Sequence, residues 1–192
     1  MVSKRFKITG VCPLLMHNGQ MANPLNPYAK ALKAISGKRN KTDADHEEMA
    51  HIEFLASLYL NEDGDPCIPS SNIRGMLLGK GGATRKRKLG KEAQLAMFVS
   101  GDYPLLYDGP RDPEELWKDE EFRFAQMLTV QTSKVLRTRP IFKEWSSEVE
   151  VFYNPDYIEN DMVEYLVGLG GAEVGIMDWR PTYGRFNVEV IG

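Results

Sequence analysis

Apolar residues follow two spacings along this chain, one typical of strands and one typical of helices, and together they predict an order of elements. Phe6, Ile8, Val11, Leu14 and Leu15 form a nearly continuous apolar run near the start. A run of this kind is typical of a strand that is covered on both faces. We therefore expect the first strand at the centre of a sheet.

Residues 17–62 interrupt this pattern with turn formers and a basic stretch. A short helix is predicted at 28–35, and the polar, basic residues 36–41 follow it. Thr42 or Asp43 then caps an amphipathic helix with acidic residues in its first turn. Long insertions in compact domains are usually functional. We interpret 17–62 as a helical, basic insertion after the first strand.

The rest of the chain alternates between helical and strand-like segments. The pattern predicts a helix ending near residue 78, a strand at 103–107, a β-hairpin within 122–145, a strand at 145–153, a helix at 159–169 and a last strand at 186–191. This order predicts an α+β fold with a ferredoxin-like (RRM-like) β-α-β-β-α-β core. We expect residues 1–192 to form a single domain, with the hairpin as a second insertion.

Composition changes this picture little. The chain has 192 residues, a net charge of -3 and ordinary amounts of apolar and charged residues. The N-terminal residues form no apolar leader, and no stretch reaches the roughly 18 apolar residues of a membrane span. Cys12 and Cys67 lie in apolar settings, which favours reduced core thiols. We expect a cytoplasmic protein with no membrane partner.

Charge is distributed in blocks of one sign. Residues 1–42 hold eight Lys or Arg and no acid, 43–65 hold eight acids and no base, and 74–91 hold seven bases and no acid. Blocks of this kind can produce a basic and an acidic face, which suits a polyanionic ligand and contacts between copies of the chain. The alternative is that the blocks scatter over the surface after folding.

The segment from Ile68 to Leu78 has the features of an anion site. Pro69 biases the preceding residue toward extended geometry, and Ser70 or Ser71 can cap the helix that follows. The N-terminal end of a helix attracts phosphate or carboxylate groups, and Arg74 is placed to lean over that end. The alternative is an ordinary capped helix with a surface arginine.

A glycine-rich segment before the last strand is the second informative region. Glycine lets the backbone approach phosphates closely, aromatic rings can stack bases, and arginines bind the phosphates. The residues of this region predicted to contact nucleic acid are Gly170, Gly171, Trp179, Arg180, Tyr183 and Arg185. The alternative is a tight helix-to-strand turn with Trp179 as a core residue.

Further basic side chains complete the predicted interface. A run of four lies shortly after the helix that ends near residue 78, and residues 131–142 mix basic with apolar residues, as in a protruding hairpin that meets a polyanion. These side chains are Lys80, Arg85, Lys86, Arg87, Lys88, Lys134, Arg137 and Arg139.

The sequence offers few candidates for metal or catalytic chemistry. His46 and His51 are five residues apart, which places them about 140° apart on a helix and not on one face as in a zinc protease. The acidic stretch 61–65 stops short of a calcium loop, and Lys80 is followed by glycine, which excludes a Walker motif. We expect no metal, no cofactor and no catalytic residue.

Two motifs resemble the RAMP superfamily of CRISPR-associated proteins, in particular the repeating backbone subunit of effector complexes. Gly64–Gly75 resembles the "xPxIPGSSLRG" entry to the first conserved helix, with Ser70 where glycine is usual and Asn72 where serine is usual. Gly168–Phe186 is similar to the glycine-rich end of those proteins. The motifs cover about thirty of the 192 residues, at two separated sites.

The resemblance implies a role in antiviral defence, in which subunits stack into a helical filament along a guide RNA. It implies phosphate contacts from Ser70, Ser71, Arg74 and the loop near Arg180, with 131–142 as the thumb hairpin. It also implies copies of the chain and other effector-complex subunits as partners. Members that cut target RNA use an aspartate in the loop after the first strand, and here no acid precedes Asp43, so we do not expect cleavage.

Three hypotheses remain open from the sequence. The first is a non-enzymatic protein that binds single-stranded RNA and self-assembles along it as the backbone of a CRISPR-type ribonucleoprotein. The second is a metal-independent endoribonuclease of the same superfamily, for which His17 is the one plausible general base. The third is a phage or mobile-element module that binds single-stranded DNA or assembles with other proteins.

Overall fold

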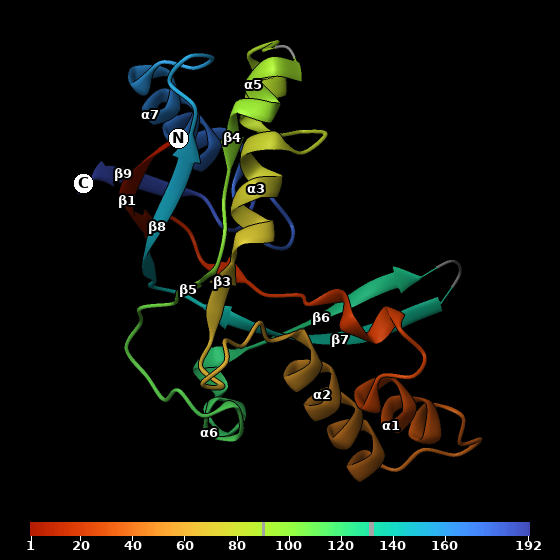
Figure 1. Ribbon diagram of the computed structural model, residues 1–192. Coiled ribbons are helices and arrows are strands. Elements are labelled where there is room, and N and C mark those ends of the chain that lie inside the picture. The colour runs from red at the N-terminus through yellow and green to blue at the C-terminus, as the bar shows by residue number, and fades with distance from the viewer. Residues whose placement is uncertain (90, 131–132) are drawn as a thin grey trace.

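The computed structural model describes residues 1–89, 91–130 and 133–192 and has an α+β architecture with antiparallel sheets (Figure 1). The helices are α1 (Pro27–Ser36), α2 (Asp43–Ser57), α3 (Ser70–Leu78), α4 (Ala83–Lys86), α5 (Lys91–Ala96), α6 (Pro113–Lys118) and α7 (Asn160–Leu169). The strands are β1 (Val2–Gly10), β2 (Leu14–Leu15), β3 (Cys67–Pro69), β4 (Met97–Phe98), β5 (Asp102–Pro104), β6 (Arg123–Val130), β7 (Ser133–Phe142), β8 (Ser146–Tyr153) and β9 (Phe186–Val190).

The main sheet has the strand order β4-β8-β1-β9, and each neighbouring pair is antiparallel. The prediction of a central first strand is confirmed, because β1 lies between β8 and β9. The strand ends at Gly10, earlier than predicted, and Val11 is exposed. Phe6 and Ile8 are fully buried on the same face of the sheet as Val149 and Val151.

Two helices cross from one strand of this sheet to another. The chain passes from β1 through the insertion and α3 to β4, and from β8 through α7 to β9. Both helices bury their apolar residues in the core that covers the inner face of the sheet, as Met76 of α3 and Leu166 of α7 illustrate. This face explains the burial of alternate residues in β8, with Val149, Val151 and Tyr153 inward as the sequence predicts.

The opposite face of the sheet is polar, with charges of both signs on facing strands. Arg5 lies across from Glu150 and Lys7 across from Glu148. At the β4 edge, the rings of Phe98 and Phe152 stack with their centroids 4.7 Å apart.

A second sheet extends away from this body. β6 and β7 form the predicted hairpin, with Arg123 opposite Pro140, and β2 adds to the other edge of β7. Figure 1 shows the hairpin running away from α3, with α1 and α2 of the insertion beside it. Thr42 caps α2 in a capping box with Asp45, as one of the two predicted alternatives.

Two local predictions are wrong. We expected Ser70 or Ser71 to cap α3, but the helix begins at Ser70 after Pro69, and in the described part of the chain neither serine side chain caps it. The amide of Ser70 instead donates to the carbonyl of Gly101 at 2.9 Å, because β3 pairs with β5 just before the helix starts. We also expected a loop directly after α7, but Gly170–Val174 continues it as a π-helical turn, η3.

Among the described residues, no helix combines the length and the apolar character that crossing a membrane requires. Cys67 is buried, Cys12 is half-buried, and both are free thiols. Burial raises the pKa of the Cys67 thiol to about 12, so this side chain stays protonated at neutral pH.

Candidate nucleic-acid interface

The segment from Gly175 to Arg185, here called the terminal loop, is held in one shape by its backbone. Gly175 and Gly184 have φ angles of 72° and 71°, which favour glycine. The amide of Ile176 donates to the carbonyl of Gly184 at 3.0 Å and so closes the loop. The amide of Gly184 donates to Pro13 and that of Asp178 to Leu15. The loop is therefore fixed on β2 and on the segment that precedes it.

The terminal loop also packs on the base of the hairpin. Arg139 of β7 forms an ion pair with Asp178, and its guanidinium carbon lies 5.3 Å from the centre of the Trp179 ring. Phe124 of β6 meets the rings of Trp179 and Tyr183 edge-on at 5.7 and 5.8 Å. Both predicted stacking residues are thus half-buried in an aromatic cluster.

On its other side the terminal loop continues from η3, which packs against α3. A Cβ on Gly170 would lie 1.7 Å from the sulfur of Met76, and one on Gly171 would lie 2.5 Å from the carbonyl oxygen of Phe186. Both glycines are buried. We expected both glycines to approach phosphates. Glycine is required there because other protein atoms occupy the space of a side chain. We therefore withdraw both glycines from the predicted interface.

Of the predicted contact residues on α3 and in the loop after it, most are accessible. Ser71, Arg74 and Lys80 are exposed and Ser70 is half-buried. Because Ser70 donates its amide to Gly101, this amide is not available to an anion, and the next N–H groups of α3 begin at Ser71.

Of the four basic residues 85–88, two contact other parts of the protein and two do not form such contacts within the described residues. Lys86 pairs with Glu173 of η3 at 3.1 Å, and Arg87 lies over the ring of Tyr165 on α7 at 4.8 Å. Arg85 and Lys88 are exposed, and neither forms an ion pair within the described residues. Two of the four cations are thus held against η3 and α7.

The remaining predicted residues lie on the terminal loop and on β7. Arg180 and Arg185 are exposed on the terminal loop. Lys134 belongs to β7, but its side chain lies outside the described ones. Arg137 and Arg139 border a surface pocket between the hairpin and the insertion.

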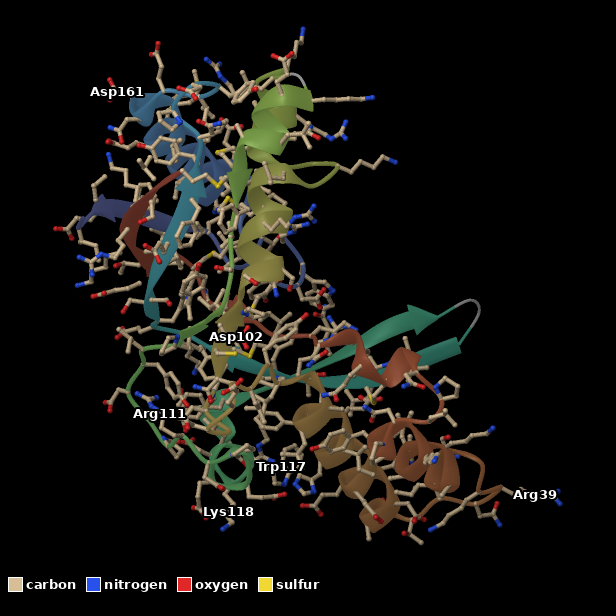
Figure 2. All side chains as sticks on the ribbon, in the orientation of Figure 1. Arg39, Asp102, Arg111, Trp117, Lys118 and Asp161 are labelled. Atoms are coloured by element: carbon tan, nitrogen blue, oxygen red, sulfur yellow. The ribbon has the colours of Figure 1, made fainter. Side chains whose placement is uncertain are left out.

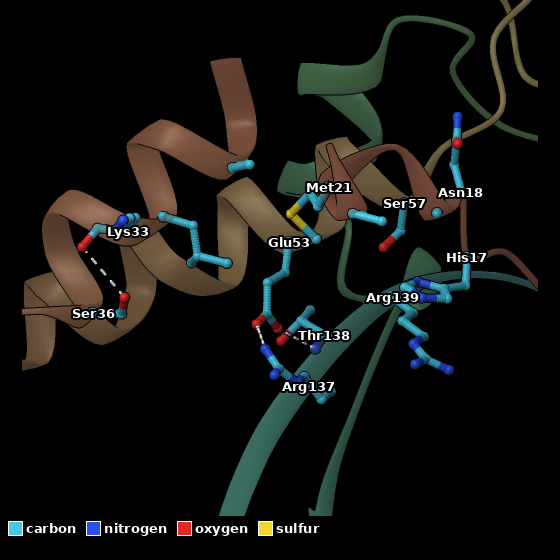
Figure 3. A pocket seen from close by; sticks show the side chains of 14 residues that line it. His17, Asn18, Met21, Lys33, Ser36, Glu53, Ser57, Arg137, Thr138 and Arg139 are labelled. Atoms are coloured by element: carbon cyan, nitrogen blue, oxygen red, sulfur yellow. Dashed lines mark hydrogen bonds and ion pairs between the residues drawn. The ribbon is translucent and has the colours of Figure 1, made fainter. Parts of the chain in front are cut away.

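This surface pocket, here called the α1 pocket, has a volume of about 460 Å³ (Figure 3). Its walls come from the segment after β2, from α1 and α2 of the insertion, and from β7. Its lining includes His17, Ala29, Leu32, Lys33, Arg137 and Arg139.

The side chain of Glu53 lines the α1 pocket. The sequence analysis did not predict it as a site residue. Its side chain is 6% exposed, forms an ion pair with Arg137 and accepts a hydrogen bond from the amide of Thr138 at 3.1 Å. A buried carboxylate requires such partners. Its position on the inward face of α2, beside Ile52 and Ala56, was the available signal.

His17 lies at the rim of the α1 pocket, near Arg139 (Figure 3). Partial burial lowers the pKa of its imidazole below the ordinary 6.5, and the charges of Arg139 and Arg137 lower it further. The lowered pKa favours the neutral form of His17, which is able to accept a proton.

The other two histidines lie on α2, outside this pocket. His51 hydrogen-bonds Glu114 at 2.8 Å and packs on the ring of Trp117, while His46 is exposed. Within the described residues, His, Cys, Asp and Glu form no group of three that could hold a metal ion.

Neither a protein-family model nor a curated protein matches this sequence. The resemblance to the RAMP superfamily therefore rests on the two motifs alone. The fold brings the second motif against α3, the helix that the first motif enters, since Gly170 of η3 packs on Met76.

Proposed function

We propose that this chain is a non-enzymatic protein that binds single-stranded RNA and self-assembles along it, as the backbone subunits of CRISPR-type ribonucleoproteins do. The observation that carries the proposal is the place of the terminal loop. It follows directly on η3, which packs on α3, and its residues Asp178 and Trp179 contact Arg139 at the base of the hairpin.

This arrangement supplies the two components that sequence-independent binding of a single strand needs. Exposed cations contact the phosphates, and half-buried aromatic rings stack bases. Arg74, Arg85, Lys88 and Arg180 are exposed, and within the described residues they form no ion pair. These side chains can therefore bind phosphates without first breaking an ion pair with a carboxylate.

The strand order supports a ferredoxin-like core, which we propose as part of this assignment. In chain order β1, α3, β4, β8, α7 and β9 follow the β-α-β-β-α-β plan, and the spatial order β4-β8-β1-β9 is that of a sheet whose first and third strands are central. The insertion and the hairpin are then additions to this core.

Self-assembly draws support from the distribution of charge. The acidic helix α6 and the basic segment around α4 and α5 lie at opposite ends of the molecule in Figure 1. Copies placed head to tail would bring opposite charges together.

Salt dependence of binding tests the proposal. We expect labelled single-stranded RNA to bind with a slope of log affinity against log salt of about -3, if roughly four phosphates are neutralised. Affinity would then fall roughly fifty-fold between 50 and 200 mM salt. Single-stranded DNA of the same length shows whether the strand is RNA or DNA, and strands of increasing length reveal assembly.

The matched pair Arg180→Ala and Lys118→Ala locates the interface. Both side chains are exposed. Lys118 is the last residue of α6 and lies at the bottom of the molecule in Figure 2. We expect Arg180→Ala to reduce the slope by about 0.7 and Lys118→Ala to leave it unchanged. Equal effects of the two variants, or binding that does not respond to salt, would refute the proposal.

The position of His17 favours a second candidate function, a metal-independent endoribonuclease. A neutral imidazole beside two arginines can take the proton from a ribose 2′-hydroxyl, while the arginines stabilise charge on the phosphorus oxygens. The 2′-oxygen then bonds to phosphorus, the bond to the 5′-oxygen breaks, and that oxygen takes a proton from water.

Cleavage assays separate the two functions. Under the nuclease hypothesis, RNA is cut in the presence of EDTA to products with 2′,3′-cyclic phosphate ends, and His17→Ala abolishes the cut. Persistence of the cleavage in His17→Ala, or intact RNA after incubation with the wild type, excludes this candidate.

A further inference from the structure

The α1 pocket combines a charged wall and an apolar wall. Arg137 and Arg139 come from β7, and Lys33 comes from the facing helix α1. Met21 and Leu32 line the pocket from η1 (Gly19–Ala22) and α1. Pockets that bind small polar molecules typically pair an apolar surface with a few convergent polar groups.

We propose that the α1 pocket binds one nucleotide unit of a single strand, with the phosphodiester at Arg137 and Lys33 and the base on the apolar wall. The proposal rests on the function proposed above and adds to it a defined subsite away from the terminal loop.

The charge of the α1 pocket fits a phosphodiester. Glu53 and Asp178 each hold one arginine, so three cations against two carboxylates leave one net positive charge around the neutral form of His17. An internal phosphodiester carries one negative charge, whereas a terminal phosphate carries nearly two. The balance therefore suits a nucleotide within a strand.

The guanidinium of Arg137 remains available to such a ligand. It pairs with Glu53 through Nη1, and its side chain is 36% exposed. An arginine can hold a carboxylate with one edge and a phosphate with the other, because its five N–H donors point in fixed, separate directions. Glu53 thus positions Arg137 without consuming all of its donors.

The base would lie against Leu32, which is half-buried on α1. A volume of about 460 Å³ falls within the range of natural ligand sites. Arg139 reaches from this pocket to the ring of Trp179 on the terminal loop, so a strand leaving the pocket passes directly to the aromatic cluster.

Two variants on the same helix test the phosphate position. Ala29 lines the α1 pocket, whereas Ala31 is exposed outside it. Ala29→Glu places a carboxylate beside Lys33, and Ala31→Glu changes the net charge equally. For a strand of twelve uridines, we expect Ala29→Glu to weaken binding at least tenfold and Ala31→Glu less than twofold.

A third variant tests the base position. Leu32→Ala removes part of the apolar wall, so we expect it to weaken binding of the twelve-uridine strand several-fold and to leave binding of a base-free ribose phosphate strand unchanged. Comparing the two strands on one variant cancels any loss of folded protein.

The outcomes separate the subsite from the proposed function. Wild-type binding that Ala29→Glu and Ala31→Glu weaken equally overturns the subsite and leaves the proposed function standing. Equal losses for both strands in Leu32→Ala also overturn it. A wild-type protein that binds neither strand overturns both proposals.

Discussion

Replacement of Gly184 by alanine is the most direct test of how the terminal loop is built. Gly184 has a φ of 71°, and a Cβ there would lie 2.0 Å from the carbonyl oxygen of Ile176. Gly64 offers a matched control, since its φ is 86° and a Cβ there would meet no atom within 4 Å in the described structure. The two substitutions share the backbone strain and differ in the clash.

The expected magnitudes follow from these two terms. A left-handed backbone costs an alanine roughly 1–2 kcal/mol. At Gly184 the backbone oxygen of Ile176 must also move by more than 1 Å to reach an ordinary contact, and overpacking of this kind costs about 1–3 kcal/mol more. We therefore expect about 1–2 kcal/mol for Gly64→Ala and about 2–5 kcal/mol for Gly184→Ala.

Urea denaturation followed by circular dichroism measures both losses. In a chain of this length each kcal/mol lowers Tm by roughly 2–4 °C, so Gly184→Ala should melt about 10 °C below the wild type. If the terminal loop contacts nucleic acid, this variant also binds single-stranded RNA more weakly at temperatures where it is folded. Equal destabilisation by the two substitutions would show that the loop tolerates the displacement and is not rigid.

Two further predictions concern the ion pairs of the insertion. Lys38 lowers the pKa of the Asp45 carboxyl from 3.8 to about 2, so this carboxylate stabilises the fold above pH 4 and its contribution is lost as the pH falls toward 2. Acid titrations of the wild type and Asp45→Asn should diverge at neutral pH and converge near pH 2, and parallel curves would contradict the assignment. Glu53→Gln removes the charge that faces Arg137 in a buried setting and should cost about 1–3 kcal/mol in urea denaturation. The exposed Glu173→Gln should cost less than about 1 kcal/mol, and similar losses for the two variants would contradict the role of burial.

The elements themselves were largely predictable because each is encoded locally. The alternation of Val149, Val151 and Tyr153 predicts both the strand and its buried face. Thr42 and Asp45 form a capping box three residues apart, so the start of α2 can be read from four positions.

The features that were missed depend on partners far away in the chain. Glu53 is buried because Arg137 and Thr138 reach it from β7, more than eighty residues later. Ser70 does not cap α3, because Gly101 of a later segment accepts its amide. Gly170 was expected to face a ligand, but Met76 faces it. In each case the local sequence pattern drew attention to the residue, but it could not specify which distant residue contacts it in the folded chain.

Arg139 has a consequence for selectivity among anions. Arg139 is held by Asp178 and its side chain is only 13% exposed, against 36% for Arg137, so an anion that engages its guanidinium displaces a carboxylate and not merely water. Chloride, which is weakly held, competes poorly in such an exchange, whereas a phosphate that offers two oxygens in the plane of the guanidinium competes well. A ligand that breaks the ion pair between Arg139 and Asp178 also removes one of the contacts that hold the terminal loop, and by thermodynamic reciprocity the two events are coupled. Occupancy of the hairpin base and the order of the C-terminal segment are thus linked through a single side chain.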